Sequence, residues 1–153
     1  MRNQKGITLI ALVITIIVLL ILAGVSIAML TGENGILTNA TESQQRTDYE
    51  NAKEQIDIAL SAIKTEALAQ MVDDNSYVPA DHGADLATAA VIGNTITSDD
   101  KYEIDTTTTD GVVEISYSNT STKVEITGKI DLNGSAGGTI TEATGTIDGQ
   151  AQS

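Results

Sequence analysis

The chain has 153 residues, which is enough for one modest domain with an appended segment. It contains 21 Asp and Glu residues against 8 Lys and Arg residues, and it has neither Trp nor Phe, so its composition argues against a nucleic-acid-binding protein. Because Cys is absent, disulfide bonds, a thiol nucleophile and Cys-based zinc sites are excluded.

An uncharged apolar segment runs from Ile7 to Leu30, directly behind Arg2 and Lys5. As a helix its 24 residues span roughly 36 Å, more than the ~30 Å hydrocarbon core of a bilayer. Its Ile, Val and Thr content favours a strand in water, but a lone strand in lipid leaves its backbone unpaired, so we expect a helix over 7–31. The basic residues ahead of the segment place the N-terminus in the cytoplasm and the C-terminal domain outside.

Three fates of this segment are open: a secretory signal that is removed, a permanent membrane anchor, or a helix that leaves the membrane to pack against copies of itself. The apolar core of a secretory signal is usually only about 7–15 residues long, shorter than this run. A small-x-small cleavage site nevertheless exists at residues 26–28 (Ser-Ile-Ala). Length therefore favours the second and third fates.

The junction between the basic head and the apolar run reads Lys5-Gly6-Ile7-Thr8-Leu9. It resembles the prepilin signal of the type IV pilin family, which includes the pseudopilins of secretion and DNA-uptake machines. The resemblance implies that a prepilin peptidase cuts between Gly6 and Ile7 and methylates the new amine of Ile7. Unlike an ordinary signal, the apolar helix then stays on the mature protein.

The resemblance further implies a leader over 1–6, a transmembrane and filament-core helix over 7–31, and assembly with other pilin subunits by an ATPase and a membrane platform. The family usually has a Glu at the position of Ala11, and that Glu meets the N-terminal amine of a neighbouring subunit. Ala11 offers no counter-charge. Either Thr8 or backbone carbonyls serve the amine, or the subunit takes a special position in the fibre, or it does not polymerise alone.

Small residues recur four apart at two places in the apolar run. That spacing lets helices approach closely, which suits a filament core, although any membrane helix contains some Gly and Ala. The candidate processing residues are Lys5, Gly6 and Ile7, and the candidate assembly residues are Thr8, Leu9, Ala11, Thr15, Gly24 and Ala28.

The helical pattern is interrupted over 32–37, where two Gly residues and an Asn predict the end of a membrane helix or a hinge for the outer domain. Apolar residues then recur every three or four positions over 38–72, which predicts an amphipathic helix packed on the following sheet. Residues 41–44 fit a capping box, with Asn34 and Thr38 as rival starts.

The apolar stripe consists of Ala52, Ile56, Ala59, Ile63, Ala67 and Met71, and the charged residues Asp48, Lys53, Asp57, Lys64 and Glu66 fall off it. Lys53 lies four residues before Asp57, so we expect a surface ion pair there.

We expect residues 73–153 to form a connecting loop, with a short helix at 85–90, followed by a sheet domain in whose strands apolar and polar residues alternate. The expected strands are 102–107, 112–117, 123–132 and 139–146, with turns at 110–111, 119–121, 133–134 and 137–138. The predicted fold class is α+β: a long N-terminal helix, membrane-spanning in its first half, packed on a small antiparallel sheet as in pilins.

An acidic stretch in the connecting loop has the ligand types that a cation would need, namely Asp73, Asp74, Asp81, His82 and Asp85. A solvated acidic loop is the better interpretation, because no calcium-loop pattern is present. His82 is the only His, and the sequence has neither a Gly-x-Ser-x-Gly motif nor a phosphate-binding Gly-Lys-Ser or Gly-Lys-Thr. We therefore expect no enzyme, no cofactor and no metal.

The preferred hypothesis is a type IV pilin-like structural subunit, a single-pass membrane protein before assembly and part of a cell-surface pilus or pseudopilus afterwards. The alternative is a single-pass anchored surface protein that presents an extracellular binding domain and does not polymerise. Ala11 keeps that alternative open. The sequence does not distinguish a major from a minor subunit.

Overall fold

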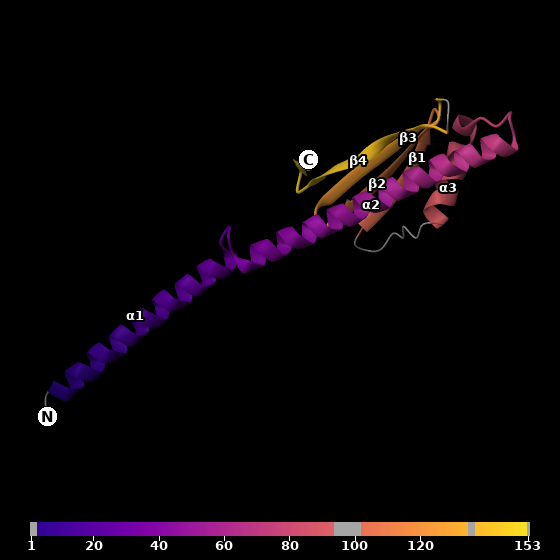
Figure 1. Cartoon of the computed structure of the whole chain (residues 1–153). Coiled ribbons are helices and arrows are strands. Elements are labelled where there is room, and N and C mark those ends of the chain that lie inside the picture. Colours follow the sequence, from indigo (N-terminus) through magenta and orange to yellow (C-terminus); the bar gives the residue numbers. More distant parts are fainter. Residues whose placement is uncertain (1–2, 94–101, 135–136, 153) are drawn as a thin grey trace. The chain divides into compact units, whose positions relative to one another are not determined.

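The computed structural model describes residues 3–93, 102–134 and 137–152 (Figure 1). The helices in these ranges are α1 (Asn3–Thr31), α2 (Ile36–Asp73), the short 3-10 helix η1 (Pro79–His82) and α3 (Gly83–Gly93). The chain divides into two compact units, Met1–Ser43 and Gln44–Ser153.

The second unit contains one antiparallel sheet, in which the five strands of the described residues follow one another in sequence order. The strands are β1 (Tyr102–Thr109), β2 (Val112–Asn119), β3 (Val124–Asp131), β4 (Thr139–Ile147) and β5 (Gln150–Ala151). The predicted turn at Asp110 and Gly111 is confirmed, and both residues have positive φ, which suits a tight hairpin between twisted strands. A similar turn at Asp148 and Gly149 adds β5, which the sequence analysis did not predict.

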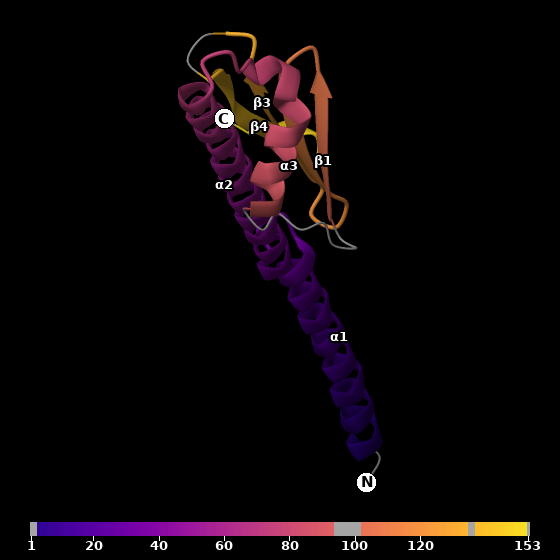
Figure 2. The same ribbon diagram turned by 90° about the vertical axis from the view of Figure 1, so that its right-hand side faces the viewer.

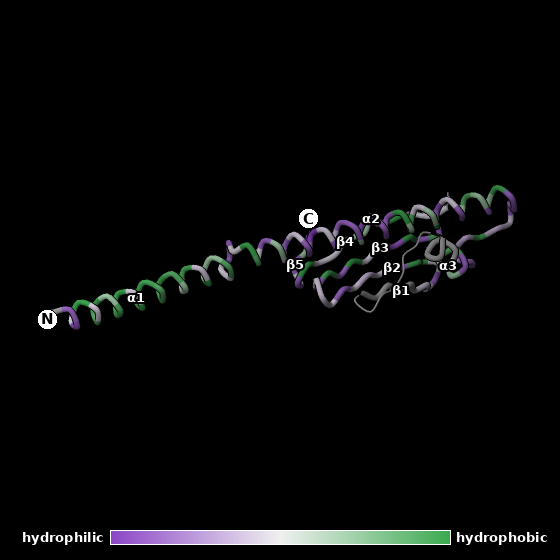
Figure 3. Tube along the Cα trace, turned by 90° about the horizontal axis from the view of Figure 1, so that it is seen from below, coloured by the Kyte–Doolittle hydropathy of each residue, from purple (hydrophilic) through white to green (hydrophobic). Residues whose placement is uncertain are grey.

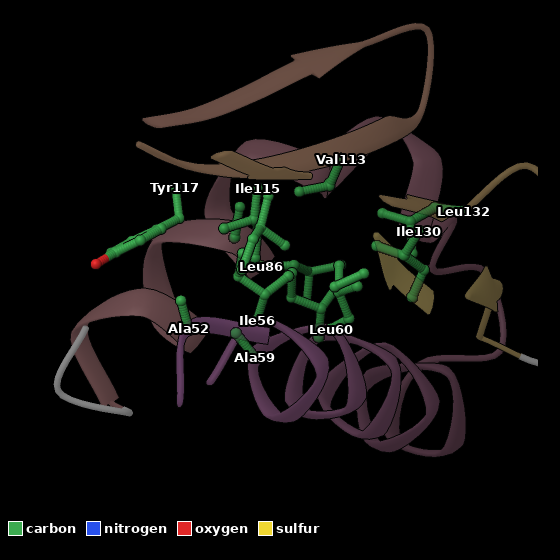
Figure 4. Packing of buried hydrophobic residues seen from close by; sticks show 14 of the residues in the cluster. Ala52, Ile56, Ala59, Leu60, Leu86, Val113, Ile115, Tyr117, Ile130 and Leu132 are labelled. Carbon is green, nitrogen blue, oxygen red and sulfur yellow. The ribbon is translucent and has the colours of Figure 1, made fainter. Parts of the chain in front are cut away.

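The core lies between one face of the sheet and the apolar stripe of α2 (Figure 4). The stripe is confirmed from Ala52 to Ala67, with Tyr49 and Leu60 as further members, whereas Met71 is only half-buried. The sheet contributes buried residues at alternate positions, namely Val113, Ile115, Tyr117, Val124, Ile126 and Ile130. Helix α3 lies over β1 and β2 and adds Leu86 to the same cluster (Figure 2). The α+β class with an antiparallel sheet is therefore confirmed.

Gly128 in β3 lets α2 come close to the sheet. A Cβ atom at this position would lie 2.6 Å from Ile56 Cγ2 and 2.8 Å from Leu60 Cδ1, so a side chain would push the helix away. The pairing of β3 with β4 is irregular beside Gly128, and the backbone N–H of Ala143 there donates to Asp57 Oδ1 of α2 at 2.9 Å. The helix is thus both packed and hydrogen-bonded to the irregular part of the sheet.

Asp48 is a second polar link between α2 and the sheet. Tyr117 Oη donates to Asp48 Oδ1 at 2.6 Å, and Asn119 Nδ2 donates to Oδ2 at 3.0 Å. The hydroxyl of Thr122 also donates to Oδ2. The expectation that Asp48 falls off the side of α2 that packs on the sheet is therefore wrong, because its half-buried carboxylate accepts from the end of β2 and from the β2–β3 turn. The predicted ion pair of Lys53 with Asp57 is confirmed at 2.8 Å.

Two predicted element boundaries need correction. Helix α2 begins at Ile36, two residues before the expected start, and Thr41 lies inside it, where its hydroxyl donates to the Leu37 carbonyl at 3.0 Å. The capping-box prediction is wrong because Thr41 lies inside α2, and a cap belongs at the start of a helix, where the first backbone N–H groups have no acceptor. The short helix expected at 85–90 is the longer α3, preceded by η1.

Candidate functional site

The candidate site is α1, an apolar helix that no part of its own compact unit covers. Every described residue from Gln4 to Thr31 is exposed, including large apolar side chains such as Leu20 at 68%. Figure 3 shows the hydrophobic colour running almost without interruption along α1, whereas α2 alternates. The helical stretch that begins at Gln4 is long and apolar enough to cross a membrane, judged by length and composition. Such a surface needs lipid or another apolar partner.

The hydroxyl groups of α1 are satisfied inside the helix. Thr8 Oγ1 donates to the Gln4 carbonyl at 2.6 Å, and Thr15 Oγ1 donates to the Ala11 carbonyl at 2.7 Å. Ser26 makes the same bond one turn back, at 2.8 Å. Because each hydroxyl has an acceptor four residues earlier, contact with hydrocarbon leaves none of these donors unpaired.

The predicted processing residues Lys5, Gly6 and Ile7 lie in the first turns of α1 and are all exposed. Nothing comes within 4 Å of the place where a Cβ of Gly6 would stand. Side-chain packing therefore does not explain a Gly at this position.

The predicted assembly residues do not form one stripe. At about 100° per residue, the pair Ala11 and Thr15 lies about 140° around the helix from the pair Gly24 and Ala28. Thr8 shares the side of the first pair. The structure therefore brings the small residues to two separate faces of α1, one near each end, where two different neighbouring helices could approach closely.

A compact turn joins α1 to α2. The Gly32 carbonyl accepts from the Gly35 N–H at 2.7 Å and from Thr38 Oγ1 at 3.1 Å, and the Gly35 carbonyl accepts from the Asn39 N–H at 3.0 Å. A Cβ at Gly35 would lie 2.6 Å from the Leu30 carbonyl oxygen, so the turn excludes a side chain there. We call residues Gly32 to Gly35 the elbow.

The acidic loop does not gather into a metal site. Among the residues that the structure describes, no group of three His, Asp or Glu side chains is close enough to hold a metal ion. The His82 ring stacks on Tyr77, with 4.7 Å between centroids, and His82 Nδ1 lies 3.9 Å from Asp85 Oδ2. Asp74 instead accepts from the hydroxyl and the N–H of Ser76, which lowers the pKa of its carboxyl.

The comparison with protein families decides what this N-terminal segment is. The family described as the prokaryotic N-terminal methylation motif matches residues 1–27. The chain carries a prepilin-type N-terminal segment. The expected resemblance to type IV pilins and pseudopilins is thus confirmed over this stretch, and it favours a structural role for the protein over a catalytic one. Comparison with curated proteins and with solved structures returned no match.

The sequence analysis missed one part of the apolar surface. Ile36 and Leu37, which it placed in the interruption over 32–37, form the exposed first turn of α2. The available signal was the pair itself, two large apolar residues directly after a polar Gly-containing turn. It was overlooked because the helix was expected to begin after them.

Proposed function

We propose that the protein is a type IV pilin-like structural subunit, cut after Gly6, methylated on Ile7 and assembled through α1 into a pilus or pseudopilus. The observation that carries this proposal is the combination of the methylation motif over residues 1–27 with a helix whose apolar side chains are all exposed. The motif supports processing that retains the helix. The exposed surface supports two successive partners, lipid first and other subunits later.

In the precursor, the leader holds α1 in the membrane with its N-terminus in the cytoplasm. Lys5 and Arg2 supply the positive charge that favours this orientation, and the acidic remainder lies outside. Cutting after Gly6 removes both basic side chains. The remaining chain has 6 basic against 21 acidic residues, all of them beyond the apolar run. Cleavage thus leaves the methylated amine of Ile7 as the one positive charge at this end of the helix, which lowers the cost of withdrawing the helix from the membrane.

Assembly then exchanges lipid contacts for contacts between helices. Lipid tails are as apolar as Leu, so the gain comes from close packing and from interhelical hydrogen bonds rather than from the hydrophobic effect. The two small-residue faces of α1, at Ala11 with Thr15 and at Gly24 with Ala28, are where close packing is expected. The acidic sheet domain forms the surface of the fibre.

Thr8 is the residue best placed to replace the missing carboxylate. Its hydroxyl donates to the carbonyl of Gln4, and Gln4 belongs to the leader. Removing the leader therefore frees the Thr8 hydroxyl beside the new amine of Ile7. A hydroxyl oxygen can accept from the methylated amine of a neighbouring subunit, although without the charge that a Glu at the position of Ala11 would supply.

The implied partners are a prepilin peptidase, other pilin subunits, an assembly ATPase and a membrane platform. One alternative retains support from Ala11, because a helix without a counter-charge for the amine is less suited to polymerise. In that case the protein remains a single-pass surface protein with an outer binding domain.

Shearing of the native cells separates the two functions. We expect an epitope-tagged wild-type chain to leave the cells with the sheared filaments, and a Gly6→Leu chain to stay with the membrane because the peptidase no longer cuts it. A control variant, Gly24→Leu, changes a Gly of the same helix away from the cut and should still be processed. A processed wild-type chain that stays with the membrane after shearing would support the anchored alternative.

A further inference from the structure

The exposed apolar surface of the first compact unit does not end with α1. Ile36 is 76% exposed and Leu37 is 58% exposed, in the first turn of α2. The next exposed large apolar side chain along α2 is Ile58, 21 residues after Leu37. Along α2, this pair therefore forms an apolar patch that is well separated from the other exposed large apolar side chains of the helix.

The elbow keeps this patch beside the end of α1. The bonds from Gly35 N–H and Thr38 Oγ1 to the Gly32 carbonyl tie the first turn of α2 to the last turn of α1. A shallow hollow at this place is lined by Ala28 and Met29 of α1, by the elbow and by Ile36. Met29 is itself 72% exposed, so the apolar surface passes from one helix to the next across the elbow.

The patch also has a polar opposite face. At about 100° per residue, Ile36, Leu37 and Ala40 lie on one side of α2, and Glu42 projects from the other. A short helix face of this kind is suited to the boundary between lipid head groups and acyl chains, where one side is apolar and the other is wet.

We propose that Met29, Ile36 and Leu37 form a membrane-interface contact that holds the elbow at the level of the lipid head groups. Lipid is the occupant because the patch continues the surface of a membrane-length helix. At about 1.5 Å per residue a ~30 Å hydrocarbon core takes about 20 residues, so a core that begins at Ile7 ends near Ile27, and Met29 lies close to the level of the head groups. The hydrogen bonds of the elbow hold Ile36 close to the end of α1, and therefore close to the level of the head groups.

This inference rests on the membrane location in the proposed function. It adds that the first turn of α2 is an interfacial part of the subunit, which must leave the lipid when α1 is withdrawn. Prepilin processing places no such demand on residues beyond the motif, which ends at residue 27.

Single-cysteine labelling tests the contact, because the chain has no native Cys to remove. The full-length precursor is reconstituted into phosphatidylcholine vesicles as Leu19→Cys, Leu37→Cys or Glu42→Cys, each carrying an environment-sensitive fluorophore. Quenching by nitroxides at shallow and deep positions of the lipid is compared with quenching by iodide in the water. We expect shallow nitroxides to quench Leu37→Cys several-fold more than they quench Glu42→Cys, and iodide to show the reverse order.

The label at Leu19 reports separately on insertion of α1. If iodide quenches the label of Leu19→Cys, the helix is not inserted, and both the proposed membrane location and the interface contact are wrong. If Leu19→Cys is quenched only by deep nitroxides while Leu37→Cys responds like Glu42→Cys, the interface contact is wrong and the membrane location stands. Protection of Leu37→Cys that disappears when the protein is diluted with lipid would show a second copy as the occupant, and would also overturn the proposal.

Discussion

The two long helices of this chain, α1 and α2, place the same kinds of apolar side chain in opposite surroundings. Leu19 in α1 is 60% exposed, whereas Leu60 in α2 is fully buried against the sheet. Helix α2 has a polar face and brings its own partner, the sheet, within one compact unit. Helix α1 has no charged residue from Ile7 onward, and nothing in its own unit covers it, so its surface needs lipid or another apolar partner. The comparison separates residues that stabilise the sheet domain from residues that need lipid or another apolar partner.

The largest expected difference is between two truncations of leucine. Leu60→Ala should lower the free energy of unfolding of the outer domain by about 3 kcal/mol, because it leaves a cavity in a packed core. Leu19→Ala should change it by less than about 0.5 kcal/mol, because Leu19 is exposed and belongs to the other compact unit. Urea unfolding of the full chain in detergent, followed by tyrosine fluorescence, measures both. Equal losses would mean that α1 contributes to the stability of the outer domain.

Asp48 offers a polar test of the same contrast. Asp48→Ala should destabilise the outer domain by about 2 kcal/mol, because Tyr117 and Asn119 lose the acceptor that their half-buried donors use. The control is Glu50→Ala, two residues away on the exposed side, which should cost less than about 0.5 kcal/mol. Similar values for the two variants would show that the Asp48 cluster does not join the helix to the sheet.

Within the first unit, the effect of adding a side chain should differ between Gly35, in the elbow, and Gly24, in α1. Gly35→Ala should open the elbow, since its Cβ would meet the Leu30 carbonyl oxygen, and exchange of the Asn39 amide hydrogen should become roughly tenfold faster. Gly24→Ala adds a methyl group in open space and should leave that exchange unchanged. Hydrogen exchange followed by mass spectrometry, on the full chain in detergent, measures this exchange rate in both variants. An unchanged rate in Gly35→Ala would mean that the elbow tolerates a side chain.

The smallest effect concerns the surface ion pair of α2. Lys53→Met should cost about 0.5 kcal/mol at neutral pH, as is usual for a partly exposed pair. The hydrogen bond with Asp57 raises the pKa of Lys53 above its ordinary 10.5. The stabilisation is therefore complete below that value and disappears as the pH rises through the raised pKa. The free energies of unfolding of wild type and Lys53→Met are measured at neutral and at strongly alkaline pH, and their difference should vanish at the alkaline pH. A difference that persists would come from packing of the Lys53 methylene groups.

Periodicity alone predicted the parts of the fold that repeat. The stripe from Ala52 to Ala67 and the alternation in β2 and β3 follow directly from side chains that must face one core. Asp48 was misplaced because its partners, Tyr117 and Asn119, lie about 70 residues away, and a local charge pattern carries no information on such pairs. The start of α2 was misplaced by two residues because the interruption was expected to last through residue 37, whereas the turn that separates the helices ends at Gly35.

For the candidate site, the prepilin-type segment was predictable because its chemistry is local: a basic head, a Gly and an uncharged run. An interruption over 32–37 was also predicted from its two Gly residues, but the hydrogen bonds of the elbow were not, because no spacing rule describes the bonds that the Gly35 N–H and the Thr38 hydroxyl donate to the Gly32 carbonyl. The grouping of the small residues into two faces of α1 follows from helix geometry once the helix is known to be continuous from Asn3 to Thr31.

The N-terminal mass of the mature protein from its native cells tests the central claim most directly. The proposal predicts a chain that begins at Ile7 with one methyl group on its amine. A chain that begins after Ala28 would be an ordinary secreted domain without the apolar helix, and would contradict the account. A chain that still carries its leader at Met1 or Arg2 would contradict processing and would favour the plain membrane anchor.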